Sequence, residues 1–434
     1  MKQYKLWAVA LALGFSSTAV AQKVTSITEK ETTRLIKTLS ADDMQGRSTF
    51  TPGIDKAADF IAQEFKRIGL KPLPGNAHYE QEFTVFRVKP GKVQAQLNSK
   101  TISPENAFAS TSQAQLNWQA DKQRQIVTIK EGANLRDELM KAQSLQEEAL
   151  VLVHPSHEQA FKNFQRYFTR SSVKTDLGKE ASKVYLLTDQ FTPGSYTINL
   201  SSNVEQLPLA NVGGMIEGKR TDEYVVFSGH YDHIGIGKAV DGDSIANGAD
   251  DDASGTAAMM MLADYYKKQG KPERSLLFVA FTAEEIGGYG SKYFSEQLDP
   301  NQIVAMFNIE MVGKPSKFGP NSAYLTGFER SDMGQLMQKS LEGTSYSIHP
   351  DPYPEQNLFY RSDNATLARL GVPAHTISSV QIDQDKTYHT VKDEFEMLNM
   401  PHLTNMIRAI ALASQSIVNG TATPSRVDKS QVRQ

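Results

Sequence analysis

Three apolar runs between Tyr224 and Glu310 each lead directly into acidic or imidazole side chains. They cover residues 225–227, 276–281 and 303–309 and are separated by helix-like segments, a pattern typical of βαβ units and a parallel sheet. In open α/β sheets the functional crevice lies at the carboxyl ends of the strands. We therefore expect a metal site formed by the residues that follow these runs: His230, Asp232, residues 250–252, Glu284, Glu285 and Glu310.

The same pattern predicts the fold class. A hydrophobic fraction of 39% over 434 residues is enough for one large domain with an insertion. We expect an α/β fold in which helices sandwich a mixed, mostly parallel sheet, with a smaller β-containing domain inserted. The expected parts are a signal peptide over residues 1–21, the main domain over 22–85 and 204–419, the insertion over 86–203 and a flexible tail over 420–434.

The first residues have the pattern of a secretory signal peptide. Lys2 and Lys5 precede an apolar stretch over residues 6–15, and residues 19–21 (AVA) have the small side chains of a cleavage site. The stretch is too short to span a bilayer. We therefore expect an exported protein, periplasmic or secreted, with no stable membrane insertion after the segment is removed.

Charge and cysteine content narrow the possible partners. Removal of the segment leaves 44 basic and 49 acidic residues, a net charge of −5. This balance argues against nucleic acid or an anionic membrane as the main partner. The chain contains no cysteine, so disulfides are excluded and stability must come from core burial and bound metal.

Residues from about 86 to about 203 differ in character from the rest. Short β-like pieces at residues 93–97, 125–129, 150–153 and 184–187 lie among Gln-rich and Lys-rich helical stretches, with no cluster of metal-ligand residue types. Loops of this length rarely lack structure of their own. We expect a second domain or a lid here.

Each polar position has an ordinary structural interpretation when it is taken alone. His230 could be a hydrogen-bonded structural histidine, and Asp252 is best interpreted as an N-cap of the helix that follows it. Glu310 follows an apolar strand, where an unpaired charge is costly, and His389 has Asp393 four residues on as a supporting partner. Five such elements in one chain favour a shared metal site instead.

Four motifs occur in order along the chain: GHYDH (residues 229–233), GADDDASG (248–255), TAEEIG (282–287) and YHTVKDE (388–394). Together they resemble the co-catalytic di-zinc aminopeptidase family, which includes secreted bacterial leucyl aminopeptidases. That family is related to glutamate carboxypeptidase, the transferrin receptor and the glutaminyl cyclases. The resemblance covers nearly all of the chain after the signal segment, apart from the insertion, and members of this type commonly carry an inserted lid or protease-associated-like domain there.

The resemblance implies two zinc ions bridged by Asp251. One would also be held by His230 and Glu310, and the other by Glu285 and His389. Nitrogen and oxygen ligands without sulfur suit zinc and would also accept cobalt or manganese. Bacterial leucyl-type members usually have aspartate where this chain has Glu310, so the resemblance implies weaker binding of that metal.

The resemblance also assigns roles to residues that do not bind metal. Glu284 matches the general base, and Asp232 matches the partner of the first histidine. Tyr360, in FYRSDN, resembles a hydroxyl donor that stabilises the oxyanion, although its offset within that motif is unusual and a packing role is an equal alternative. His233 and His375 are interpreted as supporting or core residues.

The implied function is an exported zinc aminopeptidase that hydrolyses N-terminal residues from peptides through a metal-bridged water. Its partners would be peptide substrates with a free N-terminus. Three alternatives remain: a single-metal relative of the glutaminyl cyclases, a carboxypeptidase-like relative, and a non-catalytic binding protein. Every motif position carries a side chain able to do the chemistry, which disfavours the cyclase and the binding protein.

Overall fold

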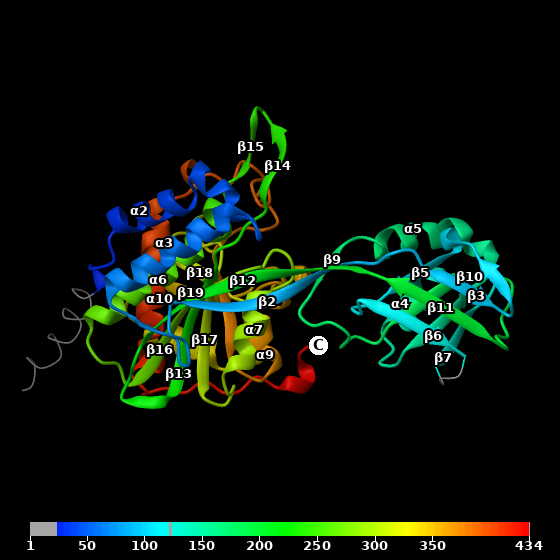
Figure 1. The fold of residues 1–434 in the computed structure, drawn as a ribbon. Helices are drawn as coiled ribbons and strands as arrows, with labels where there is room; N and C mark the ends of the chain where they lie inside the picture. Colours follow the sequence, from blue (N-terminus) through cyan, green and yellow to red (C-terminus); the bar gives the residue numbers. More distant parts are fainter. Residues whose placement is uncertain (1–23, 121–123, 434) are drawn as a thin grey trace, which may run out of the picture. The chain divides into compact units, whose positions relative to one another are not determined.

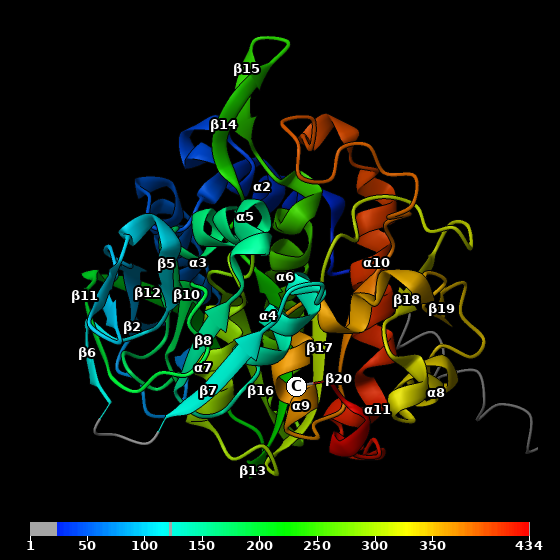
Figure 2. The same cartoon turned by 90° about the vertical axis from the view of Figure 1, so that its right-hand side faces the viewer.

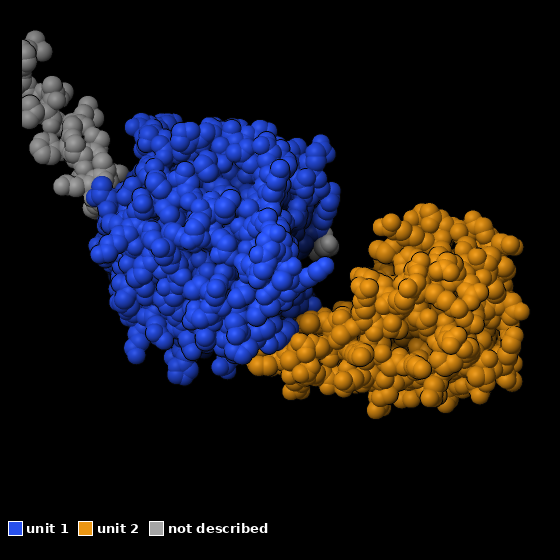
Figure 3. Space-filling view, turned by 90° about the horizontal axis from the view of Figure 1, so that it is seen from above, with its two compact units in different colours: residues 1–83, 209–434 blue, residues 84–208 orange. Residues whose placement is uncertain are grey.

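The computed structural model describes residues 24–120 and 124–433, so the expected signal peptide lies outside the described residues. The chain divides into two compact units (Figure 3). Unit 1 comprises residues 1–83 and 209–434, and unit 2 comprises residues 84–208. Within the described ranges, every helix is too short or too polar to cross a bilayer.

Unit 1 is built around a mixed, mostly parallel sheet (Figures 1 and 2), which confirms the predicted fold class. The strand order is β19-β18-β20-β17-β13-β16-β12-β2-β9, and β1 (Lys71–Pro72) also pairs with β12; β9 is Ser172–Lys174. The pairs β13–β16, β13–β17, β17–β20 and β18–β19 are parallel, whereas β12–β16 and β18–β20 are antiparallel. The strands are β2 (Glu80–Lys89), β12 (Asn203–Ile216), β13 (Arg220–His230), β16 (Arg274–Phe281), β17 (Ile303–Ile309), β18 (Ser322–Leu325), β19 (Ser347–Pro350) and β20 (Ala374–Ser378).

Side chains of the central strands alternate between two cores, because successive side chains of a strand point to opposite faces of the sheet. In β13, Val225 and Phe227 belong to one core and Val226 to the other. The first core is covered by α2 (Glu29–Leu39), α3 (Pro52–Ile68), α6 (Gly255–Lys268) and α10 (Met400–Ala413), and the second by α7 (Tyr289–Gln297) and α9 (Asn364–Arg369). Helix α3 ends at Ile68 and is capped by Gly69, whose φ of 81° is in the left-handed region that glycine adopts readily.

Unit 2 has its own cores between two small sheets and two helices. One sheet has the order β5-β10-β8-β7 and the other β4-β3-β11-β6. The apolar residues of β8 and β10 contribute to both cores of this unit. The elements are β3 (Gln94–Leu97), β4 (Lys100–Ile102), β5 (Ala107–Ser110), β6 (Gln115–Gln119), β7 (Gln125–Ile129), α4 (Leu135–Gln143), β8 (Ala149–Val153), α5 (Glu158–Phe168), β10 (Lys183–Leu187) and β11 (Tyr196–Ser201).

The C-terminal segment differs from the flexible tail expected over residues 420–434. Val427 and Val432 are buried in the second core of unit 1. Arg426 donates to the main-chain carbonyl of Ile303, at the start of β17. The segment therefore packs on unit 1 through two apolar side chains. The average composition of the segment is polar and does not reveal this packing.

Candidate metal centre

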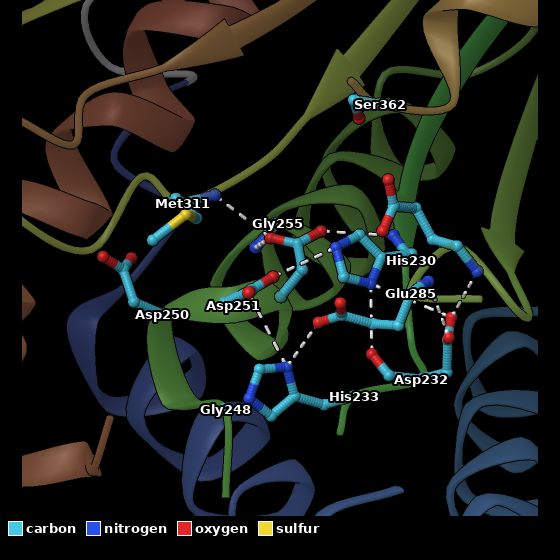
Figure 4. Close-up of polar contacts among 12 residues, drawn as sticks. His230, Asp232, His233, Gly248, Asp250, Asp251, Gly255, Glu285, Met311 and Ser362 are labelled. Carbon is cyan, nitrogen blue, oxygen red and sulfur yellow. Dashed lines mark hydrogen bonds and ion pairs between the residues drawn. The ribbon is translucent and has the colours of Figure 1, made fainter. Parts of the chain in front are cut away.

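Strand ends and loops of unit 1 bring the predicted metal ligands to one edge of the sheet (Figure 4). β13 ends at His230, and the neighbouring parallel strands β16 and β17 lead to Glu285 and Glu310. Asp251 lies in a short helical segment (Ala249–Ser254) just before α6, and His389 lies in the loop after β20. Because the carboxyl ends of parallel strands share one edge, residues far apart in the sequence become neighbours here.

His230, Asp251 and Glu310 form one group of ligand-type atoms. One atom of each residue lies within 4.8 Å of the others. His230 Nε2 is 3.2 Å from Asp251 Oδ1. On the other side of the ring, the main-chain carbonyl of Asp232 accepts a hydrogen bond of 3.0 Å from His230 Nδ1. This bond fixes the tautomer in which Nε2 is free to bind a metal.

Asp251 also belongs to a second group, with Glu285 and His389. His389 Nε2 lies 3.3 Å from Asp251 Oδ2 and 3.0 Å from Glu285 Oε2. His233 reaches the same carboxylates, and its Nδ1 is 2.8 Å from Glu285 Oε1. Because His233 engages Oε1 of Glu285 and leaves Oε2 beside His389, its geometry fits a supporting role.

The chemistry of the two groups fits metal ions. Among the described residues, four of their buried atoms have no hydrogen-bond partner: His230 Nε2, His233 Nε2, Asp251 Oδ2 and Glu310 Oε2. A buried polar atom without a partner is costly. A cation bound between His230 Nε2, Asp251 Oδ2 and Glu310 Oε2 would remove that cost for these three atoms, whereas His233 Nε2 lies on the side of its ring away from Glu285. All the donors are nitrogen or oxygen, a set that suits zinc.

The charges of the cluster also favour a cation. Burial alone would raise the pKa of Asp251, but the imidazoles of His233, His230 and His389 hold it well below its ordinary value. Hydrogen bonds to Asp251 and Glu285 raise the pKa of His389 to about 10, and burial followed by the charge of Asp251 raises the pKa of Glu310 to about 7. A divalent metal bound by these groups would compete with protons for the same atoms.

Three further aspartates hold the loops that carry the ligands. Asp232 accepts hydrogen bonds from the amides of Glu284 and Glu285, at 3.0 and 3.2 Å. The other two accept from further amides near the ligands: Asp252 from His230, Gly255 and Met311, and Asp393 from Asp250 and Asp251. Asp250 points away from the cluster (Figure 4) and accepts from the amide of Gly313.

Two expected partner assignments are wrong in detail. Asp232 binds His230 through its main-chain carbonyl, because its carboxylate lies 3.8 Å from Nδ1 and is directed to the Glu284–Glu285 loop. Asp393 supports the amide of Asp251, at 2.9 Å, rather than His389. Spacing in the sequence places these carboxylates near the site but does not say which loop each one faces.

Glu284 lies half-buried beside the metal ligands. Burial, followed by the carboxylates of Glu310 and Asp363, holds its pKa well above the ordinary value, although His230 opposes this shift. A raised pKa suits a carboxylate that accepts a proton near neutral pH. The role of general base stays a prediction.

The backbone next to the ligands is strained. Ala283, Met311 and His389 have φ angles of 60°, 52° and 55°. Left-handed φ angles are uncommon in residues other than glycine and cost free energy. Three such residues at one site indicate that holding the metal ligands in position lowers the stability of the folded state.

Tyr360 does not lie where its predicted role requires. It packs against the second core of unit 1, and its hydroxyl accepts a hydrogen bond of 3.5 Å from the amide of Arg433. Tyr388 lies at the site instead: its ring stacks on His389 with centroids 3.9 Å apart, and it lines a pocket together with Glu310. Tyr388 directly precedes the predicted ligand His389 in YHTVKDE, and this adjacency could have indicated its position at the site.

Two buried charged residues near the site were not singled out from the sequence. Arg47 is fully buried and donates to the main-chain carbonyls of Leu39, Tyr231, Asn247 and Gly248. Asp363 is also buried, and burial raises its pKa to about 6. A single arginine in a polar loop, or an aspartate before a short helix, gives no pattern that reveals burial.

His375 is a core residue, one of the two roles expected for it. Its Nδ1 donates to the carbonyl of Thr326 at 2.8 Å, and its Nε2 is 2.7 Å from Ser331 Oγ. The ring is fully buried. Its two ring nitrogens are therefore both engaged away from the metal ligands.

Comparison with solved structures places this architecture among the aminopeptidases. An aminopeptidase from Aneurinibacillus sp. strain AM-1 is similar with a TM-score of 0.55, covering 96% of this chain and 98% of its own, at 17% identity. A zinc aminopeptidase from Bacillus subtilis is similar with a TM-score of 0.54, covering 94% and 99%, also at 17% identity. At these identities the likeness is one of fold.

Comparison of sequences finds similarity to a family of peptidases. Residues 211–414 match the model of peptidase family M28. Leucine aminopeptidase 1 from Penicillium rubens is 28% identical over 200 residues, which are 42% of this chain and 50% of that protein. The chain spans half or less of the length of several curated relatives that it matches. The matches to the M28 model and to leucine aminopeptidases confirm the resemblance carried by the motifs of the chain.

Proposed function

We propose that this chain is an exported zinc aminopeptidase that releases single residues from the N-terminus of peptides. The observation that carries the proposal is the pair of ligand groups that share Asp251, with Glu284 beside them. Two carboxylate–imidazole groups around one bridging carboxylate form a suitable site for two metal ions.

The chain's own residues divide the work. Bound zinc ions would polarise the scissile carbonyl and lower the pKa of the attacking water. Glu284 takes the proton of that water and passes it to the departing amine, and its raised pKa suits this exchange. Tyr388, stacked on His389, would donate a hydrogen bond from its hydroxyl group to the developing oxyanion.

A pocket beside Glu310 supports cleavage at the N-terminus. Apolar side chains (Met311, Leu358, Val380 and Ile382) and polar ones (Thr326, Arg361, Ser362, Thr376 and Ser378) line it together with Glu310, Tyr324 and Tyr388. Its volume is about 40 Å³, room for one small apolar side chain rather than a longer segment. The free α-amine of the substrate would then lie next to the carboxylate of Glu310.

Aminoacyl-p-nitroanilides, assayed with and without a chelator, test the proposal. We expect hydrolysis that is lost on chelation and restored by zinc, and no cleavage of matched N-acetylated substrates. Release of C-terminal residues would show a carboxypeptidase, and cyclisation of N-terminal glutamine would show a cyclase. Complete inactivity with zinc bound would support a binding protein.

Export rests on the residues before the described range. Lys2, Lys5 and the AVA sequence at residues 19–21 have the order of a cleavable secretory signal. N-terminal sequencing of the protein from its native compartment should begin at or near Gln22. An intact Met1 would contradict export by this route.

A further inference from the structure

A two-stranded hairpin projects from unit 1 near the metal centre (Figures 1 and 2). It consists of β14 (Gly235–Val240) and β15 (Asp243–Ala246), which pair only with each other among the described strands. Its apolar side chains Ile234, Ile236 and Val240 are 40%, 60% and 46% exposed. Clustered exposed apolar residues of this kind commonly mark a binding surface.

A groove runs between this hairpin and the loop that carries His389. The hairpin and the residue before it contribute apolar side chains (Ile234, Val240 and Ala246), two glycines and the charged Lys238, and the loop contributes His389 and residues 390–391. Beyond the groove lining, Lys392 Nζ lies 3.4 Å from Asp241 Oδ2, so an ion pair links the loop to the hairpin turn. The volume of the groove is about 240 Å³, compared with about 40 Å³ for the pocket beside Glu310.

The groove and the pocket border different ligands of the same cluster. Glu310 lines the pocket, and His389 lines the groove. A peptide whose N-terminal side chain fills the pocket has its scissile bond at the cluster and must continue beyond it. The groove is the larger of the two spaces, and its lining includes His389, a residue of the cluster.

We propose that this groove binds the residues that follow the scissile bond and selects apolar side chains there. The inference rests on the proposed aminopeptidase function. The unpaired outer edges of β14 and β15 offer main-chain donors and acceptors to an extended peptide, as in strand addition. The apolar lining at Ile234 and Val240 would contact alternate side chains of that peptide.

Substrates of increasing length test the groove. The first residue is fixed as the one that the p-nitroanilide panel favours, and its amide, whose leaving group is ammonia, gives the baseline. Tetrapeptides with leucine at the second and third positions are compared with tetrapeptides that have serine there, because serine is polar but is not attracted by the charge of Lys238 in the groove lining. We expect kcat/KM to rise by about tenfold or more from the amide to the leucine tetrapeptide, and less for the serine one.

Val240→Asp should lower the ratio of kcat/KM between the leucine tetrapeptide and the amide by about tenfold. Val240→Leu should preserve it. Ile236→Asp is the matched control, because Ile236 is exposed on the same strand but does not line the groove. The proposal is wrong if Val240→Asp leaves the ratio unchanged, or if Ile236→Asp lowers it equally.

Two other outcomes distinguish failure of the groove proposal from failure of the proposed aminopeptidase function. If the amide and the p-nitroanilides are not hydrolysed at all, the proposed function fails and the inference falls with it. If Val240→Asp converts a dimer into a monomer by light scattering without changing the ratio, the hairpin is a contact between copies and the inference alone is wrong.

Discussion

The two units bury charge in very different amounts. Unit 2 has apolar cores, and its deeply buried charged groups are few: Lys183 donates to two main-chain carbonyls, and Arg124 pairs with Glu148. Unit 1 buries a dense set of charged residues beneath and around the metal centre: Arg47, Asp232, Asp250, Asp251, Asp252, Asp363 and Asp393. A charge in a protein interior costs free energy unless it is paired and hydrogen-bonded.

The larger number of buried charged groups in unit 1 indicates that this unit carries the function at some cost to stability. Unit 2 gains its stability from apolar burial, as in the packing of Leu150 and Leu152. Unit 1 compensates its carboxylates with main-chain amides, with Arg47 and, on our proposal, with two metal ions. We therefore expect substitutions in unit 1 to affect activity and metal content most strongly, whereas unit 2 should respond only through packing.

The largest effect is expected from Glu284→Gln. It removes the proposed proton acceptor but no ligand, so kcat should fall by about 10²- to 10⁴-fold while metal content stays normal. Steady-state kinetics and metal analysis measure the two quantities. Glu296→Gln, at an exposed position of α7, is the control. Loss of metal in Glu284→Gln would show that the roles of Glu284 and Glu285 are reversed.

Glu310→Ala should release one of the two metals while the other remains bound. Activity should fall with it, because the carboxylate beside the α-amine is lost. Glu310→Asp should keep measurable activity, since the negative charge and the carboxylate ligand survive. Aspartate also has one rotatable bond fewer than glutamate to immobilise when it binds the metal. Metal analysis with calorimetric titration decides between these cases. Two metals per chain and unchanged kcat/KM in Glu310→Ala would show that the metal site assigned to His230, Asp251 and Glu310 is wrong.

Arg47→Met sharpens the comparison between the units. It leaves main-chain carbonyls without donors and removes a positive charge near four buried carboxylates, so unit 1 should lose about 3–5 kcal/mol of unfolding free energy. Arg124→Met, in unit 2, should cost about 1 kcal/mol or less, because its partner Glu148 is partly exposed.

Tryptophan fluorescence separates the two responses. Apart from the tryptophan of the signal segment, Trp118 is the only one in the chain, and it is buried in unit 2. Urea unfolding followed by Trp118 fluorescence therefore reports unit 2, and unfolding followed by loss of activity reports unit 1. Equal losses in the two variants would contradict a special role for Arg47.

The sequence predicted the central sheet because its strand signals are strong. Residues 276–281 form an unbroken apolar run, and all of β16 is buried. The acidic and imidazole residues after such runs gather at one edge for a topological reason. The grouping of His230, Asp251 and Glu310 follows from connectivity more than from any detail of side-chain packing.

The sequence could not predict features that depend on side-chain direction. Tyr360 and Tyr388 both occur in polar sequence motifs. In the structure, however, Tyr360 packs against the second core of unit 1, whereas Tyr388 stacks on His389. Val432 looks like part of a polar tail until its packing partners are known. Arg47 is a lone arginine in a loop, and only the fold supplies the carbonyls that bury it.

The smallest expected effect concerns the stability of unit 1 in mild acid. Burial lowers the pKa of His375 to about 4, although the carbonyl of Thr326 opposes the shift. Its Nε2 faces Ser331 Oγ, which also accepts a hydrogen bond from the amide of Met333. Protonation of His375 would place a hydrogen on Nε2, facing Ser331 Oγ, and a charge in the buried core. The folded state therefore resists protonation of this residue.

The unfolded chain binds the proton at an ordinary pKa near 6.5, so it gains protons before the folded state as the pH falls. Stability from this residue is therefore complete above about pH 6.5 and falls as the pH drops toward 4, with a loss of about 2 kcal/mol at pH 5. His375→Gln should unfold more easily at pH 7.5 but lose less between pH 7.5 and 5 than the parent. His157→Gln, in unit 2, is the matched control, and unfolding followed by loss of activity gives the readout. An equal loss in His375→Gln and the parent would show that the titration lies elsewhere among the buried groups of unit 1.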